Sequence, residues 1–93
     1  MFSIICPTYN SSSYLEETLE SLLSQKYRKF EIIFSDDDSS DNTVKILESY
    51  ENKFSSIGVN IKIVRNNHGG PGFARNKGLR WANFEWVCFL DSD

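Results

Sequence analysis

The sequence predicts a single α/β domain built on an open parallel sheet with helices on both faces. Short apolar runs alternate with amphipathic stretches along the whole chain, in the order β-α-β-α-β-α-β. Turn and capping residues separate these segments, and no repeat or linker interrupts them. With 93 residues, of which 40% are hydrophobic and 14% aromatic, the chain has the composition of one small packed domain.

The first half of the chain predicts two buried strands joined by a helix. The run FSIICP over residues 2–7 has the composition of a buried strand, and Pro7 ends it. Apolar side chains then recur at three- and four-residue steps, which predicts a helix over 12–25 with serines as N-cap candidates. A second buried strand, FEIIFS at 30–35, runs into a cluster of aspartates.

The second half predicts two more helices and two more strands. Helical spacing returns over 44–57, and Gly58 is typical of the residue that closes such a helix. The segment 59–64 alternates apolar and polar residues, which places a strand toward a sheet edge. A short helix over 73–83 and a strand over 85–90 complete the series.

Charge and hydropathy exclude several kinds of partner and location. A net charge of −3 argues against a nucleic-acid binder, because such proteins cluster Lys and Arg. No apolar stretch approaches the ~20 residues of a membrane helix, and Met1 is not followed by a signal peptide. We therefore expect a cytoplasmic protein, with attachment of a full-length form to the inner face of the membrane left open.

The two cysteines, Cys6 and Cys88, both lie inside apolar runs without the spacing of a zinc site. We expect both to be buried free thiols in a reducing compartment. If their strands are neighbours, the two thiols lie close together.

Chemically active side chains follow the predicted strands at their carboxyl ends, where open parallel sheets bind ligands. The first strand ends in PTYN, the second in aspartates 36–38, and the fourth in Asp91 and Asp93. Two neighbouring carboxylates repel each other unless one is protonated or a cation lies between them. Oxygen ligands suit Mg²⁺ or Mn²⁺, which would bring a nucleoside diphosphate with it. In the alternative interpretation, Asp91 and Asp93 only cap the segment that follows.

Two further features indicate a nucleotide. Asp37 is placed to accept a hydrogen bond from a base N–H, and the Tyr9 ring to pack on that base, although a turn residue and a core residue are the plain alternatives. The loop HGGPGFARNKG lacks the Gly-x-Gly-x-x-Gly pattern of a dinucleotide site. It can still bring backbone N–H groups and a helix N-terminus near an anion, aided by Arg75 or Lys77. His68 receives no role.

Four segments in order, SIICPTYN, SLLSQKYRKFEIIFSDDDSSDNT, GGPGFARNKGLRWA and EWVCFLDSD, resemble the start of a family 2 glycosyltransferase with the GT-A fold. The resemblance spans essentially the whole chain and implies a Rossmann-like nucleotide-binding half. It implies that Asp37 binds the nucleotide base and that Pro7 and Tyr9 line the base pocket.

The same resemblance assigns the Asp91-Ser92-Asp93 motif to the ribose, the diphosphate and a divalent cation, with Asp93 as the direct metal ligand and Asp91 beside it. Arg75 and Asn76 are weaker candidates near the donor. One departure is Asp38, because the family often has Gly after its aspartate pair, and this leaves the local turn geometry open.

The resemblance implies inverting transfer of a sugar from a nucleotide diphosphate sugar to a hydroxyl of a glycan or lipid-linked acceptor, and we expect the donor to be a UDP-sugar. Residues 1–93 then correspond to the N-terminal nucleotide-binding part, with the sheet truncated after its fourth strand. The acceptor-binding half and the catalytic base are expected further along the chain. We expect the fragment to bind nucleotide and metal weakly and not to catalyse transfer.

Two alternatives from other classes remain. A receiver-like signalling domain also gathers acidic groups and Mg²⁺ at strand ends, but it needs its acidic pair after the first strand, where this chain has PTYN. A non-catalytic nucleotide-binding module is the second. Exposed sheet edges would allow either kind of domain to form a homodimer.

Overall fold

The computed structural model describes residues 1–91, which form four strands and three helices. In chain order these are β1 (Phe2–Thr8), α1 (Ser12–Leu23), β2 (Phe30–Asp36), α2 (Thr43–Ser56), β3 (Ile61–Arg65), α3 (Pro71–Leu79) and β4 (Val87–Phe89). The predicted order of elements is confirmed. The largest boundary differences are in the second half: α3 begins two residues before the predicted start and ends four before the predicted end, β3 begins two residues later, and β4 is shorter than the predicted strand.

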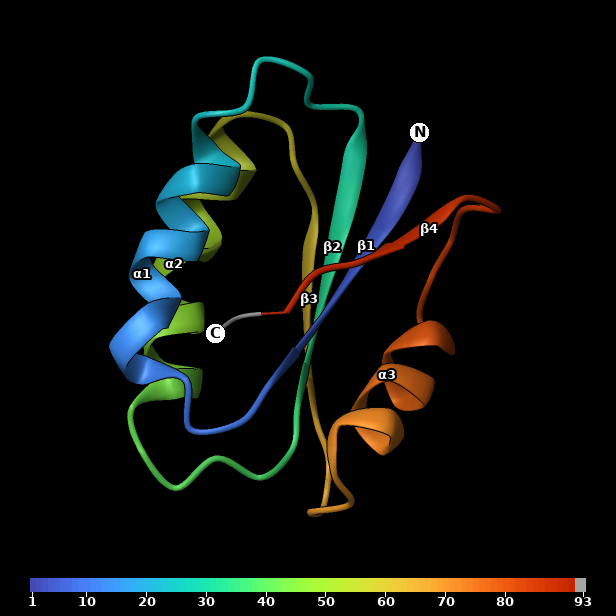
Figure 1. The fold of residues 1–93 in the computed structure, drawn as a ribbon. Helices are drawn as coiled ribbons and strands as arrows, with labels where there is room; N and C mark the ends of the chain where they lie inside the picture. The colour runs from blue at the N-terminus through green and yellow to red at the C-terminus, as the bar shows by residue number, and fades with distance from the viewer. Residues whose placement is uncertain (92–93) are drawn as a thin grey trace.

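The strands form one parallel sheet in the order β3-β2-β1-β4. Helices α1 and α2 cover one face of the sheet and α3 covers the other (Figure 1). The predicted α/β fold, an open parallel sheet with helices on both faces, is therefore confirmed. So is the edge position of β3. The chain reverses its direction across the sheet between β1 and β4, because α3 carries it back from β3 to the opposite side.

The main core lies between the sheet and the helices α1 and α2. Alternate residues of β1 and β2 point to this face because side chains in a strand alternate with a period of two. Every residue of β2 is buried, since the strand has a neighbour on each side and helices on both faces. The buried cluster consists of Ile4, Cys6, Leu15, Leu19, Leu22, Phe30, Ile32, Phe34, Leu47, Tyr50, Phe54 and Val59.

Helix α3 lies close against the opposite face of the sheet because a glycine stands at the contact. A Cβ atom built on Gly78 would lie 2.7 Å from Cγ2 of Ile5 and 3.3 Å from Cβ of Ser35. A partly buried polar cluster also ties this side together. The Glu31 carboxylate accepts a hydrogen bond from the Ser3 hydroxyl and two from Asn83, at 2.7 Å from its backbone N and 2.8 Å from Nδ2. These contacts fix the turn between α3 and β4.

The cysteine prediction is correct for one residue and wrong for the other. Cys6 is buried, and burial together with the nearby charge of Asp91 raises the pKa of its thiol to about 12. Cys88 is exposed because β4 is an edge strand that pairs only with β1. The two strands are neighbours, with Cys88 opposite Ile4, and both thiols are free. None of the helices in residues 1–91 is long and apolar enough to cross a membrane.

Candidate functional site

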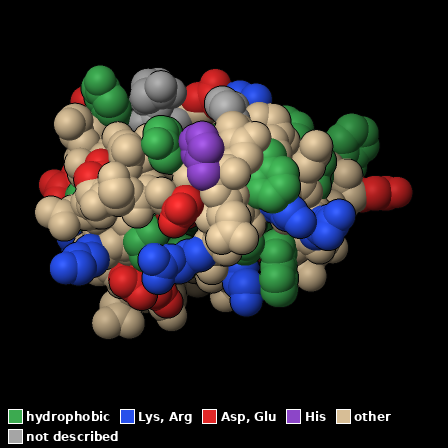
Figure 2. All heavy atoms as spheres, turned by 90° about the horizontal axis from the view of Figure 1, so that it is seen from below, with side chains coloured by type: hydrophobic (Ala, Val, Ile, Leu, Met, Phe, Trp, Pro, Cys, Tyr) green, Lys and Arg blue, Asp and Glu red, His purple; other side chains and the backbone are tan. Residues whose placement is uncertain are grey.

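A cavity of about 510 Å³ opens at the carboxyl ends of β1, β2 and β4, beside the point where the strand order reverses. Open α/β sheets bind ligands at this position. Figure 2 looks onto this edge of the molecule, where the single histidine stands close to a hydrophobic and an acidic side chain. The cavity is lined by Pro7, Thr8, Tyr9, Ser11, Asp37, His68, Gly70, Ala74, Arg75 and Asp91.

Most of the site residues expected from the sequence meet in this cavity. The lining includes Pro7, Tyr9, Asp37, Arg75 and Asp91, which come from the ends of β1, β2 and β4 and from α3. Asn76 is exposed on α3 and does not line the cavity. Asp93, expected to be the direct metal ligand, lies outside the described residues.

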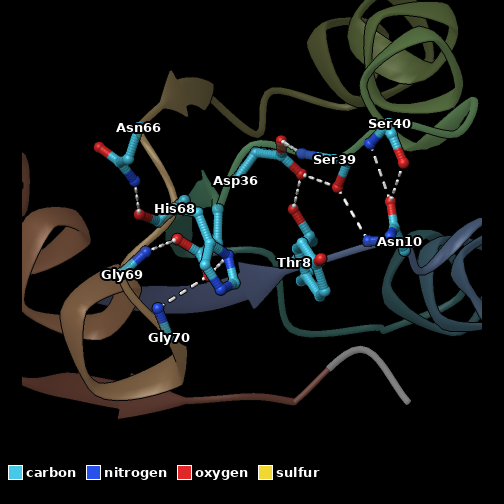
Figure 3. A network of polar contacts seen from close by, with 12 residues as sticks. Thr8, Asn10, Asp36, Ser39, Ser40, Asn66, His68, Gly69 and Gly70 are labelled. Atoms are coloured by element: carbon cyan, nitrogen blue, oxygen red, sulfur yellow. Dashed lines mark hydrogen bonds and ion pairs between the residues drawn. The ribbon is translucent and has the colours of Figure 1, made fainter.

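The Asp37 carboxylate is buried and held by two backbone donors, with an imidazole in contact beside them. Its oxygens accept hydrogen bonds from the backbone N–H groups of Gly69, at 2.7 Å, and Gly70, at 2.9 Å. His68 Nδ1 lies 3.0 Å from Oδ2, and only 3% of the Asp37 side chain is exposed. The loop does bring N–H groups and a helix N-terminus to an anion, as the sequence indicates (Figure 3). That anion is the carboxylate of the protein itself.

His68 also lines this cavity, although no role was expected for it. Its ring lies 5.0 Å from the Tyr9 ring, centroid to centroid, with the two planes at 44°. The imidazole therefore contacts both residues that we expect to bind a base. The one sequence signal for His68 is its position next to the Gly-Gly pair of the loop. That position does not predict a contact with Asp37, which follows a different strand.

Asp36 has a structural role next to the cavity. Its carboxylate accepts hydrogen bonds from the Thr8 hydroxyl at 2.7 Å and from the Ser39 hydroxyl at 2.6 Å and backbone N–H at 2.8 Å. The ends of β1 and β2 and the following loop are thereby joined (Figure 3). The spacing of Asp36 and Asp38 therefore marks a turn and not a second acidic site.

Asp38 occupies a backbone conformation that favours glycine. Its φ is 62°, in the left-handed region that glycine, Asn and Asp adopt more readily than other residues. This explains why a family with glycine here accepts Asp. The side chain is exposed and adds charge outside the cavity.

Asp91 is paired with Arg75 at the cavity rim. Arg75 Nη2 lies 2.9 Å from Asp91 Oδ1, and the two side chains are 37% and 60% exposed. The other Asp91 oxygen is a hard donor of the kind that Mg²⁺ and Mn²⁺ prefer. Among residues 1–91, no group of three or more His, Cys, Asp and Glu side chains forms a metal site. One carboxylate and one guanidinium thus define this end of the cavity, and they suit a cation and a phosphate respectively.

A comparison with known protein families decides between these interpretations. The model of Glycosyl transferase family 2 matches residues 3–93. This chain belongs to that family. The receiver-like alternative is therefore not favoured.

Relatives and solved structures agree with this assignment. The chain is 45% identical over 94 residues to the poly(ribitol-phosphate) beta-N-acetylglucosaminyltransferase TarS of Staphylococcus aureus, covering 99% of this chain but 16% of TarS. The structure of S. aureus TarS 1–349 in complex with UDP matches with a TM-score of 0.86 and 43% identity, over 98% of this chain and 27% of that one. The mannosyltransferase PcManGT from Pyrobaculum calidifontis, in complex with GDP-Man and Mn²⁺, matches with a TM-score of 0.84 and 29% identity over the same shares.

Proposed function

We propose that residues 1–93 bind the nucleotide diphosphate sugar donor of a longer family 2 glycosyltransferase, and that this donor is a UDP-sugar. The observation that carries the proposal is the meeting of Tyr9, Asp37 and the Arg75–Asp91 pair in one cavity at the strand-order reversal. The cavity volume of about 510 Å³ is within the usual range for a small-molecule site. The similarity to a TarS structure in complex with UDP supports the choice of uridine.

The base is proposed to bind at the Asp37 end of the cavity. Each oxygen of Asp37 accepts one backbone N–H, from Gly69 or from Gly70, and a carboxylate oxygen can accept two hydrogen bonds. Uracil presents its N3–H donor in the plane of its ring, and the exposed Tyr9 ring offers a flat apolar surface beside it. The two side chains therefore match one edge and one face of the base.

The diphosphate is proposed to bind at the Arg75–Asp91 end with a divalent cation, Mn²⁺ or Mg²⁺. The guanidinium of Arg75 suits a phosphate oxygen, and the free oxygen of Asp91 suits the cation, with Asp93 as a further ligand. PcManGT binds GDP-Man with Mn²⁺, which supports a cation in this role. When bound, the cation neutralises charge on the leaving diphosphate.

The acceptor end of the reaction is proposed from the relatives. This chain spans 16% of the length of TarS, so most of that enzyme has no counterpart in residues 1–93. We infer that a glycan or lipid-linked acceptor and the catalytic base for inverting transfer belong to further parts of the full-length enzyme. Residues 1–93 alone then bind the donor weakly without catalysis.

We also propose that the protein acts in the cytoplasm. A homodimer formed through the edge strands stays a prediction.

Calorimetric titration with UDP in the presence of MnCl₂ tests the proposal. We expect saturable binding to the wild-type chain and binding about tenfold or more weaker for Asp37→Asn, since a hydrogen bond to a charged group contributes about 1.5–3 kcal/mol. Asp38→Asn is the matched control, because it removes an equal charge from the next residue, which is exposed. A folded chain that binds no UDP, or an Asp37→Asn variant that binds like the wild type, would contradict the proposal.

A further inference from the structure

His68 differs from the two backbone donors to Asp37, because rotation of its side chain can move it away from the carboxylate. Gly69 and Gly70 donate through the backbone at the start of α3, where the loop and helix fix their positions. His68 contacts Asp37 through a side chain that is 59% exposed to solvent. The Asp37 side chain beneath it is only 3% exposed. A base N–H reaches this carboxylate freely only when a group that covers it moves, and the imidazole is the one held by a side chain.

The imidazole also makes the two contacts proposed for the base. Its Nδ1 lies 3.0 Å from Asp37 Oδ2, and the centroid of its ring lies 5.0 Å from that of Tyr9. Imidazole and uracil are both flat rings that carry an N–H donor on one edge. All three side chains line the same cavity. The protein without nucleotide therefore satisfies its own base site with His68.

We propose that His68 is a further residue of the nucleotide site, one that occupies the base position and is displaced when a uracil base binds. The inference rests on the proposed function and adds an internal competitor to it. Displacement moves a side chain that is already more than half exposed to solvent, so the main losses are its contacts with Asp37 and Tyr9. Uracil replaces both of them. We call the state with His68 against Asp37 closed. The apparent affinity for the base is that of the open state multiplied by the fraction of molecules that are open.

Titration of the chain with UMP, in the absence of metal, tests this displacement at the base end alone. If His68 is closed in about four molecules of five, His68→Ala binds UMP about fivefold more tightly than the wild type. His68→Gln retains an amide donor for Asp37 without the ring, and we expect its affinity between the two. Asn67→Ala is the control: its side chain is exposed in the same loop and makes none of the three Asp37 contacts, so its affinity should equal that of the wild type.

N3-methyl-UMP separates displacement from a general loosening of the loop. This ligand has no N3–H to donate to Asp37, and its methyl group would face the buried carboxylate. It should therefore not enter the base position in the wild type or in His68→Ala. The single histidine also gives one set of imidazole NMR signals, which should shift on saturation with UMP and not with N3-methyl-UMP.

The results distinguish failure of this inference from failure of the proposed function. Tighter UMP binding by His68→Ala, confined to the ligand with an N3–H, supports displacement. Weaker or unchanged UMP binding by that variant overturns it and assigns His68 to holding Asp37 in place or to no role. Absence of UMP and UDP binding in the wild type and in every variant overturns the proposed nucleotide site itself, and the displacement with it.

Discussion

Asp41 joins the first turns of the two helices on one face of the sheet. Its Oδ1 accepts a hydrogen bond from the backbone N–H of Thr43 at 2.9 Å, and its Oδ2 accepts one from Ser12 at 3.2 Å. These residues are the first of α2 and α1. Desolvation opposes ionisation of this carboxyl, but the hydrogen bonds from Thr43 and Ser12 outweigh it and lower its pKa to about 2. Asp41 thus satisfies the first backbone N–H group of both helices.

Substitution of Asp41 is expected to lower stability in a pH-dependent way. Asp41→Ala should cost about 1 kcal/mol near neutral pH, because capping donors lose their acceptor. The pKa of Asp41 is about 2 in the folded state and 3.8 ordinarily. The charged carboxylate therefore stabilises the fold fully above pH 3.8, and this stabilisation is lost as the pH falls through about 2. Urea unfolding at several pH values should show the wild type and Asp41→Ala converging in acid. A constant difference at all pH values would contradict this role.

The residues of the site were predictable where they follow a strand and not where they depend on a contact. Tyr9, Asp37 and Asp91 follow buried strands, and parallel strands end at one edge, so their convergence follows from the order of elements. His68 contacts Asp37 across separate segments, and periodicity carries no information on such a pair. The exposure of Cys88 likewise depends on strand order, which the apolar run around it does not specify.

At the level of elements, the sequence predicted the existence of the helices better than the residues at which they begin and end. The three- and four-residue apolar spacing of α1 and α2 reflects a single buried face on each helix. Helix α3 has a weaker pattern because it meets the sheet partly through small residues, Ala74 and Gly78, which are both buried. It begins at Pro71, a residue suited to the first helical turn, and this start lies before the apolar residues that the prediction used.

Two glycines of α3 should respond in opposite ways to the same substitution. Gly78→Ala should destabilise the fold by about 1–3 kcal/mol, because the new Cβ would overpack a contact 2.7 Å from buried Ile5. Gly72→Ala should be neutral or stabilising by up to about 1 kcal/mol, since nothing lies within 4 Å and alanine favours helix. Thermal and urea unfolding of both variants measure this difference. Equal effects would show that α3 does not pack closely on the sheet.

At the scale of the whole molecule, the sheet is unevenly supported. Strands β1 and β2 lie at its centre, β3 is an edge strand next to α2, and β4 is an edge strand of three residues with two of them exposed. Large apolar side chains around β4 are exposed as well, including Trp86 at 77% and Phe89 at 46%. The cavity spans this gradient, because Asp37 follows the central β2 and Asp91 follows β4. The base end of the site therefore follows the best-packed strand, β2, and the cation end follows the least-packed strand, β4.

Native-state amide exchange should follow this gradient. Amides of β1 and β2 are expected to exchange slowest, at rates set by global unfolding, because every route to solvent opens the main core. Those of β4 should exchange fastest among the strands, since its short ladder is bonded to β1 alone and can open without disturbing α1 or α2. Strand β3 is the internal control, because it is also an edge strand but packs beside α2. If β4 were as protected as β2 in dilute solution, a second surface would have to cover its exposed side chains, and exchange measured over a range of protein concentrations would identify that surface as another copy of the chain.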